Sequence, residues 1–497
     1  MNYTSTRDNN LSVSASYAIA NGISAEGGLF VPCDIPRVDA DFINSLVQMN
    51  YIDRARAVLS LFLTDYSKEE LDADTLGAYG TGFRHDKKAP TVKLPDGTSV
   101  LELWHGPTCA FKDMALQLLP YLLTGAAARV NSGKETVILV ATSGDTGKAA
   151  LEGFADVPGT RILVFYPNDG VSPMQKLQMT TQQGANVGVA AIEGNFDDAQ
   201  TGVKNIFTSA DVKARLESRN MLFSSANSIN WGRLVPQIVY YFSAYADMLE
   251  AGTIKPGDKV NFTVPTGNFG DILAGYYAME MGLPVNRLIC ASNANDVLTE
   301  FLTTGRYNRV RPFHTTISPS MDILISSNLE RLLYHLCGGD SKLISKLFAE
   351  LKENGEYTVD DALLAKIKSI FAAGCCTDDE TKTVIAETFK EQGYLCDTHT
   401  AVAIGVNKKY VKATGDTTPA CIVSTASPYK FSGAVADALG GNTEGLDDFE
   451  KLDEIETLTG TEAPSPLKTL RGAKPRFTAV VKKEDMVQAV YELLRIE

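Results

Sequence analysis

The chain has 497 residues, of which 44% are hydrophobic and 21% are charged, and its formal net charge is −14. This length exceeds what a single hydrophobic core organises, so we expect two or three domains of an ordinary globular protein. The acidic balance, which no basic tract interrupts, argues against a nucleic-acid partner. It leaves room for a phosphorylated substrate, because a pocket can hold one with a few local cations and backbone N–H groups.

The cysteines, histidines and N-terminus exclude further classes. The eight cysteines show no CxxC and no disulfide framework, which is typical of reduced thiols in a cytosolic protein. The five histidines form no HExxH or similar pair, so we expect no metal site. The first residues lack the apolar core of a signal peptide, and no apolar run reaches the roughly 18 residues of a membrane span. We therefore expect a cytoplasmic protein with no membrane partner.

Residues 1–95 are predicted to form a separate opening unit, with helices at 13–23, 41–47 and 53–63 and a hairpin at 91–99. Beyond residue 136 strands alternate with helices, which is typical of βαβ units and a mostly parallel sheet. A surface connection is predicted at 456–476. The strands are predicted at 136–140, 161–165, 185–192, 222–225, 259–264, 288–291 and 421–425, and the helices at 148–154, 174–183, 198–210, 233–249, 272–281, 341–351, 359–371, 381–391, 401–411 and 486–495.

One lysine stands at the start of an apolar helix. The segment LWHGPTCAFKDMALQ, residues 103–117, places Lys112 after a Gly-Pro turn and before leucines at helical spacing from Asp113 onward. Burial and the positive end of a helix both lower the pKa of an ammonium group. A lysine with a free lone pair is what Schiff-base chemistry requires. A solvated lysine in a turn is the simpler interpretation when this segment is considered alone, because fully buried lysines are rare.

Three loops that follow predicted strands carry unusual chemistry. The sequence ATSGDTG at 141–147 offers backbone N–H groups and hydroxyls for a carboxylate or phosphate, although an ordinary helix cap explains it equally well. The sequence PTGNFGD at 265–271 places two glycines around Asn268 and predicts a backbone cup for a phosphate. The sequence STASP at 424–428 offers a neutral hydroxyl that can bind a pyridine nitrogen or simply cap the next segment.

Together these motifs resemble a known family. HGPTCAFKD at 105–113, ATSGDTG and PTGNFGD stand in the order and at the separations seen in threonine synthases. The similarity covers nearly the whole chain and points to the longer bacterial and fungal branch. Thr398 and Ser427 depart from the family, which often shows proline and histidine there. Further matches are STR at 5–7, GGLFVP at 27–32, NSINWGR at 227–233, SPSMDI at 318–323, DTHTA at 397–401 and STASP at 424–428.

The resemblance implies an α/β fold with two open, mostly parallel α/β sheet domains of the fold type II, tryptophan-synthase-β-like class. An additional N-terminal unit is implied over residues 1–95, and the active site is expected between the domains. Residues 96–235 would form the half with the Schiff-base lysine and the carboxylate loop. Residues 236–497 would form the half with the cofactor-phosphate loop and a helical C-terminal part. The implied state is a monomer or homodimer.

The resemblance also implies the site residues and one cofactor, pyridoxal 5′-phosphate. Lys112 would bind it as a Schiff base and, once released by the substrate amine, act as general base. The implied cofactor-binding residues are Gly267, Asn268, Phe269, Gly270 and Asp271 around the phosphate, Thr425 at the pyridine nitrogen and Asp145 near the ring hydroxyl. The implied substrate-binding residues are Thr142, Ser143 and Thr146 at the substrate carboxylate, together with Asn230 and Arg233. Arg233 is the first candidate for binding the substrate phosphate. Lys176 and Arg7 are weaker candidates for this role.

The implied reaction converts O-phospho-L-homoserine and water to L-threonine and phosphate, the last step of threonine biosynthesis. It would proceed by proton abstraction at Cα and Cβ, loss of the γ-phosphate and addition of water at Cβ. The nearest alternative is another enzyme of the same fold, such as a serine or threonine dehydratase. The opening unit and residues 227–233 favour the first interpretation. An alternative of another class is a non-enzymatic, nucleotide-binding α/β protein that uses the two glycine loops.

Overall fold

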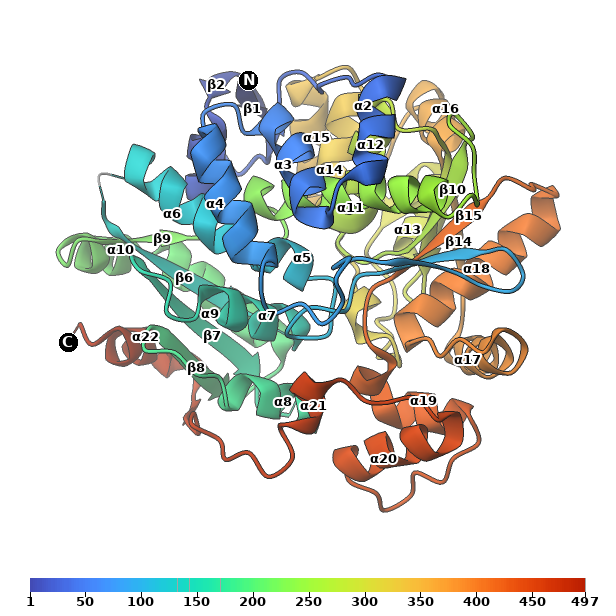
Figure 1. Ribbon diagram of the computed structural model, residues 1–497. Helices are drawn as coiled ribbons and strands as arrows, with labels where there is room; N and C mark the ends of the chain where they lie inside the picture. Colours follow the sequence, from blue (N-terminus) through green and yellow to red (C-terminus); the bar gives the residue numbers. More distant parts are fainter. Residues whose placement is uncertain (132, 143, 170, 497) are drawn as a thin grey trace.

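A computed structural model of the chain describes residues 1–131, 133–142, 144–169 and 171–496. Two sheets, each associated with helices, form the body of the molecule, and the N-terminal elements lie over the larger sheet (Figure 1). In the described residues, no helix is long and apolar enough to cross a membrane. The expectation of an α/β protein with two mostly parallel sheets is confirmed.

The larger sheet contains, among the described residues, six strands in the order β14-β11-β10-β15-β5-β4. Its neighbouring strands are parallel except for β5 and β4 at one edge. Because β4 and β5 precede the first four strands of the smaller sheet in the chain while the other strands follow them, both halves of the chain build this sheet. Its strands are β4 Thr91–Lys93, β5 Ser99–Glu102, β10 Val260–Pro265, β11 Val285–Ser292, β14 Phe371–Cys375 and β15 Ala420–Ser424.

The smaller sheet is parallel throughout, and the described part of it has the order β16-β8-β7-β6-β9. The C-terminal strand β16 returns to pair with β8, and α22 lies beside it (Figure 1). Its strands are β6 Glu135–Ala141, β7 Thr160–Pro167, β8 Val187–Ile192, β9 Met221–Ser224 and β16 Val480–Val481, and its helices are α7 Asp145–Phe154, α8 Pro173–Thr180, α9 Phe196–Thr208, α10 Ala210–Glu217, η4 Lys483–Asp485 and α22 Met486–Leu494.

The N-terminal elements form a small antiparallel sheet, order β2-β1-β3, followed by helices. Their buried side chains belong to the same hydrophobic core as those of the larger sheet, so this unit packs as part of the body of the molecule. Its elements are β1 Tyr3–Ser5, β2 Asp8–Val13, α1 Ala15–Asn21, β3 Phe30–Pro32, α2 Ala40–Ser45, η1 Leu46–Gln48, α3 Tyr51–Phe62 and α4 Lys68–Tyr79.

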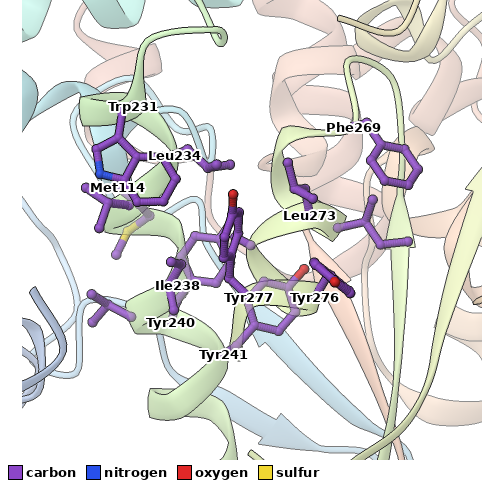
Figure 2. Close-up of a cluster of buried hydrophobic side chains, with 14 of the residues drawn as sticks. Met114, Trp231, Leu234, Ile238, Tyr240, Tyr241, Phe269, Leu273, Tyr276 and Tyr277 are labelled. Carbon is purple, nitrogen blue, oxygen red and sulfur yellow. The ribbon is translucent and has the colours of Figure 1, made fainter. Parts of the chain in front are cut away.

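Helix α11, Trp231–Glu250, is central to the core. Its side chains are buried on every face from Trp231 to Met248, as expected for a helix surrounded by other elements. It packs against α3 of the N-terminal unit, against α5 (Asp113–Leu116) and against α12 (Gly270–Met281). Figure 2 shows its side chains together with Met114 of α5 and with Leu273, Tyr276 and Tyr277 of α12. One buried helix therefore joins the lysine segment to the glycine loop.

Most of the remaining elements extend the larger sheet's side of the molecule, whereas α6 packs against α1 of the N-terminal unit. Strands β12 and β13, which are distant in the chain, form a short antiparallel pair. A helical group follows β15 (Figure 1). These elements are α6 Leu119–Val130, α13 Val297–Thr304, β12 Arg306–Asn308, η2 Pro319–Met321, α14 Leu329–Leu336, α15 Ser341–Asn354, β13 Glu356–Thr358, α16 Asp361–Ile370, α17 Asp378–Gln392, α18 Thr398–Thr414, η3 Pro428–Phe431, α19 Ser432–Ala438, α20 Asp448–Thr459 and α21 Ser465–Lys468.

Several expectations need correction. The helix predicted after Lys112 is divided into α5 and α6, because Pro120 occupies the first turn of α6 and cannot continue a preceding helix. The predicted surface connection at 456–476 contains the end of α20 and all of α21. Helix α4 was not predicted, and β14 was not recognised because its sequence FAAGC is poor in β-branched residues. The division of the chain at residues 95 and 235 stays a proposal.

Candidate active site

Lys112 lies in a largely buried position at the start of α5. Its side chain is 11% exposed, and its Nζ lies 4.6 Å from the centre of the Phe111 ring. Burial lowers the pKa of Lys112 to about 8, although the negative charge of Asp145 acts in the opposite direction. Because α5 is a single turn, burial rather than a helix dipole accounts for the lowered pKa. A substantial share of this amine is therefore neutral near physiological pH.

The lysine segment is held by the loop after β15. The backbone N–H of Phe111 donates to the carbonyl of Thr425 (2.8 Å), and that of Ser427 donates to the carbonyl of Cys109 (3.0 Å). The hydroxyl of Ser424 is already engaged, since it accepts hydrogen bonds from the Trp104 indole and the Thr400 hydroxyl. The Thr425 hydroxyl has no hydrogen-bond partner among the described residues. Of the two neighbouring hydroxyls, Thr425 is thus the one that remains available.

Asp145, the first residue of α7, lies between two lysines. One carboxylate oxygen, Oδ1, is 2.7 Å from Lys430 Nζ, and the other, Oδ2, is 3.9 Å from Lys112 Nζ. Gln175 of α8 also donates to Oδ1. Burial opposes ionisation of this carboxyl, but Lys430 and Lys112 outweigh it and hold the pKa of Asp145 below its usual range. The site therefore contains a permanent carboxylate beside the Lys112 amine.

The glycine loop forms the cup that its sequence predicts. Phe269 adopts a left-handed conformation (φ 62°), and α12 begins at Gly270. The carbonyls of Gly267 and Asn268 are turned away and accept hydrogen bonds from Ser326 and Asn328. The backbone N–H groups of residues 267–270 have no hydrogen-bond partner in the part of the chain that the structure describes. Consecutive free N–H groups at a helix N-terminus are suited to an anion.

Asp271 follows the cup and connects it to Lys112. Its Oδ1 accepts hydrogen bonds from the hydroxyls of Tyr240 (2.7 Å) and Tyr241 (2.8 Å), two residues of α11 that Figure 2 labels. Burial raises the pKa of this carboxyl to about 6, and the positive charge of Lys112 partly offsets the effect. The Asp271 carboxyl, next to the glycine loop, and the Lys112 amine therefore interact electrostatically.

Arg233, in the first turn of α11, provides a second place for an anion. The guanidinium is buried, with Nη1 donating to the carbonyl of Ala226 (2.9 Å). Its Nε has no partner, and no carboxylate pairs with it among the described residues. Burial lowers the pKa of Arg233 to about 10, and its charge in turn disfavours the ammonium form of Lys112. A buried, unpaired guanidinium close to the reactive lysine is suited to an anionic ligand.

The other substrate-binding candidates occupy different positions. Thr142 Oγ1 accepts hydrogen bonds from the N–H groups of Gly144 and Gly147 and so shapes its loop, whereas the Thr146 hydroxyl is half-buried without a partner among the described residues. Asn230 caps α11 and uses both amide hydrogens on backbone carbonyls, so its direct binding of substrate stays a prediction. Ser143 lies outside the described residues.

The weaker cation candidates already have partners. Arg7 forms a bidentate contact with Glu330, and Lys176 donates to Asn168. Lys430 and Gln175, by contrast, were missed by sequence reasoning. The signal for Lys430 was its place in PYKF, where a lysine stands between two aromatic residues directly after the hydroxyl loop.

The residues present fit pyridoxal phosphate. A buried amine, four unpartnered backbone donors in the cup and one unpartnered hydroxyl correspond to the aldehyde, phosphate and ring nitrogen of that cofactor. A Cβ added at Gly267 would lie 2.6 Å from the carbonyl oxygen of Ser320, so the cup also requires glycine there. Among the described residues, no group of three or more histidine, cysteine, aspartate or glutamate side chains could hold a metal ion.

Comparison with known sequences and structures identifies the family. The family models described as threonine synthase N terminus, pyridoxal-phosphate dependent enzyme and threonine synthase, C-terminal match residues 2–79, 87–345 and 400–490. Threonine synthase of Pseudomonas aeruginosa is 40% identical over 450 residues, which cover 90% of this chain and 92% of that protein. A crystal structure of pyridoxal-phosphate-bound threonine synthase from Brucella melitensis has a TM-score of 0.87 and 38% identity, with 100% of each chain covered.

Human threonine synthase-like 1 is also similar, at 41% identity over 434 residues and 85% of this chain. That match spans only 58% of the length of the human protein. Together with the geometry of the lysine, the cup and the buried guanidinium, these similarities show that the chain belongs to the threonine synthase family of pyridoxal-phosphate-dependent enzymes.

Proposed function

We propose that the chain converts O-phospho-L-homoserine and water to L-threonine and phosphate. The proposal is supported by family membership and by the presence of two separate anion sites near one buried amine. We place the activity in the cytoplasm, because the described cysteines are all free thiols, which fits a reducing compartment.

The observation that carries the proposal is the buried guanidinium of Arg233. The backbone N–H groups of the cup at residues 267–270 would hold the cofactor phosphate. The unpaired guanidinium of Arg233 therefore needs another anion. A substrate with both a carboxylate and a phosphate provides it. A dehydratase acting on serine or threonine has no phosphate to place there, and the same residue would leave a buried charge without a partner.

When bound, pyridoxal phosphate supplies a conjugated ring that stabilises negative charge on the substrate carbons. Lys112 would hold its aldehyde carbon, residues 267–270 its phosphate, Thr425 its ring nitrogen and Asp145 its ring hydroxyl. The work of the remaining residues is to place the substrate. The Thr146 hydroxyl and the backbone N–H groups of Asp145 and Thr146, at the start of α7, would receive the substrate carboxylate.

Lys112 also provides the base. With a pKa of about 8, its free amine can accept a proton from the substrate Cα and return one later in the reaction. Burial beside the Phe111 ring keeps the amine poorly solvated. Arg233 compensates the charge of the departing phosphate, which develops at the γ position as the Cγ–O bond breaks.

Product analysis of the purified full-length chain tests the proposal. With pyridoxal phosphate present, we expect release of inorganic phosphate from O-phospho-L-homoserine and little release of ammonia from L-threonine. Lys112→Ala should abolish phosphate release while leaving the melting temperature close to that of the wild type. Ammonia release from L-threonine as the main activity would favour the dehydratase. Absence of a visible absorption band that borohydride removes would favour the non-enzymatic alternative.

A further inference from the structure

The strongest unassigned feature near the site is a fully buried lysine. Lys430 lies in η3, directly after the loop that holds the lysine segment, and its side chain has no exposed surface. Its Nζ donates to the carbonyl oxygen of Thr108 (3.0 Å) and pairs with Asp145 Oδ1 (2.7 Å). Because Asp145 begins a helix of the smaller sheet, this ion pair also connects the two sheets. Nothing in the proposed reaction requires a second lysine here.

The Asp145 carboxylate lies closer to the Lys430 amine than to the Lys112 amine. Asp145 Oδ1 is in direct contact with Lys430 and accepts from Gln175 at 3.1 Å, whereas Oδ2 is 3.9 Å from Lys112 Nζ. Coulomb attraction falls with distance, and a hydrogen-bonded contact adds to it. The Asp145 carboxylate therefore interacts more strongly with Lys430 than with Lys112.

We propose that Lys430 is a positioning residue that draws the Asp145 carboxylate away from Lys112 and so keeps the Lys112 amine available as an uncharged nucleophile and base. Without Lys430, the same carboxylate would be free to close onto Lys112 and to hold it as an ammonium ion. The inference rests on the proposed role of Lys112 as the residue that binds the cofactor.

The other charged groups around Lys112 are not placed to change the protonation of its amine in this way. Arg233 and Lys430 disfavour its ammonium form, and Asp145 and Asp113 favour it. Asp113 is already occupied, since both its oxygens accept hydrogen bonds from Thr108. Asp271, on the opposite side, accepts from two tyrosine hydroxyls. Asp145 is thus the carboxylate whose distance from Lys112 depends on a single buried cation.

The experiment measures how fast pyridoxal phosphate becomes attached to Lys112 in the cofactor-free full-length chain as pH is varied. Attachment is followed by the visible band and confirmed by borohydride reduction. In the wild type, the rate should rise with pH with a midpoint near 8, the pKa of Lys112. In Lys430→Met, we expect the midpoint to move upward by about one pH unit, which makes attachment below the midpoint roughly tenfold slower. Lys430→Arg should restore the wild-type midpoint.

Matched variants separate positioning from a merely structural role. Lys148→Met removes a half-buried lysine of α7, which pairs with Glu152 at 2.8 Å, and should leave the midpoint unchanged. If Lys430→Met does not fold, Lys430→Gln keeps a donor for the Thr108 carbonyl and should show the same upward shift. In an Asp145→Asn background, the shift caused by Lys430→Met should be smaller.

An unchanged or lowered midpoint in the Lys430 variants, or an equal shift in the Asp145→Asn background, would overturn the inference. Because no substrate is present, these outcomes are independent of the reaction catalysed. Failure of the wild type to attach the cofactor would instead overturn the role of Lys112.

Discussion

Charged side chains that usually stay in water are buried here around one point. Lys112, Lys430, Arg233 and Asp145 are all largely or fully buried, and their charges are distributed so that the reactive amine has the lowered pKa. The sequence indicates Lys112 because it precedes an apolar helix after a turn, and the family resemblance indicates Arg233 as a cation for the substrate phosphate. It cannot identify the ion pair of Lys430 with Asp145, because the two residues meet only when distant parts of the chain pack together.

The choice between Ser424 and Thr425 shows the same limit. From the sequence, either hydroxyl can face a pyridine nitrogen or cap the next segment. The structure distinguishes them because Trp104, 320 residues earlier in the chain, donates to the Ser424 hydroxyl. Local pattern therefore places the loop at the site, and long-range packing decides which of its atoms remains free.

Arg233 is the residue whose role is most directly testable. In Arg233→Ala, we expect KM for O-phospho-L-homoserine to rise by about ten- to a hundredfold, because a charge-assisted hydrogen bond is worth about 1.5–3 kcal/mol. The dissociation constant of pyridoxal phosphate should change much less, since the cup supplies its own donors. Steady-state kinetics and a cofactor titration measure the two quantities.

Lys176→Ala is the matched control, because Lys176 is another candidate cation, whose Nζ donates to Asn168. It should leave KM near the wild-type value. Equal losses of substrate and cofactor affinity in Arg233→Ala would indicate that this arginine mainly supports folding of the α11 start.

At the scale of elements, the alternating strand and helix pattern predicts most of both sheets. Strands such as β6, β7 and β10 are continuous apolar runs between turn signals, and such runs are typical of parallel strands buried on both faces. The pattern does not show that β4 and β5 join the larger sheet, because β5 pairs with β15 more than 300 residues later in the chain and β4 joins only through β5. The lysine helix is also shorter than its leucine spacing indicates, because Pro120 starts a new helix.

The contact between α7 and α5 leads to a prediction at this scale. A Cβ added at Gly153 of α7 would lie only 2.0 Å from the carbonyl oxygen of Leu116, the last residue of α5. Alanine in a helix is normally stabilising by about 0.5–1 kcal/mol over glycine. Here the overlap with a backbone atom should cost about 1–3 kcal/mol and reverse the sign. We therefore expect Gly153→Ala to lower the melting temperature and to slow cofactor attachment.

Gly433→Ala in α19 serves as the control for this prediction. The nearest atom to its added Cβ is Lys451 Cδ at 3.8 Å, an ordinary contact with a flexible side chain. Its melting temperature should be unchanged or slightly raised. Equal melting temperatures of the two variants would show that the contact between α7 and α5 has room for an added methyl group.

At the scale of the whole molecule, buried arginines tie the N-terminal unit to the loops of the site. Arg331 of α14 donates to the carbonyl of Phe30 in β3 (2.9 Å) and to that of Ile229 (2.6 Å), just before the start of α11. It also contacts Asn328, whose backbone and side-chain N–H groups hold the Asn268 carbonyl of the cup. The N-terminal unit is therefore linked by hydrogen bonds to the segment before α11 and, through Asn328, to the glycine loop.

Arg7 provides the test of this connection. Its guanidinium makes two hydrogen bonds to Glu330, whose side chain is 4% exposed. In Arg7→Ala, the Glu330 carboxylate should remain buried without its cation, a change that typically costs about 3–5 kcal/mol. We expect the N-terminal unit to loosen, which limited proteolysis would detect as faster cleavage in the largely exposed segment at residues 80–88.

The double variant Arg7→Ala with Glu330→Gln shows whether the ion pair or the packing of the Arg7 side chain holds the N-terminal unit in place. Because it removes the unpaired charge, it should recover most of the protease resistance, even though it restores no contact for the missing guanidinium. The Thr6 hydroxyl, which donates to Glu330, can still donate to the glutamine oxygen. Equal cleavage rates in the single and double variants would show that the packing of Arg7 against Phe348 holds the unit in place, and that the buried carboxylate contributes little.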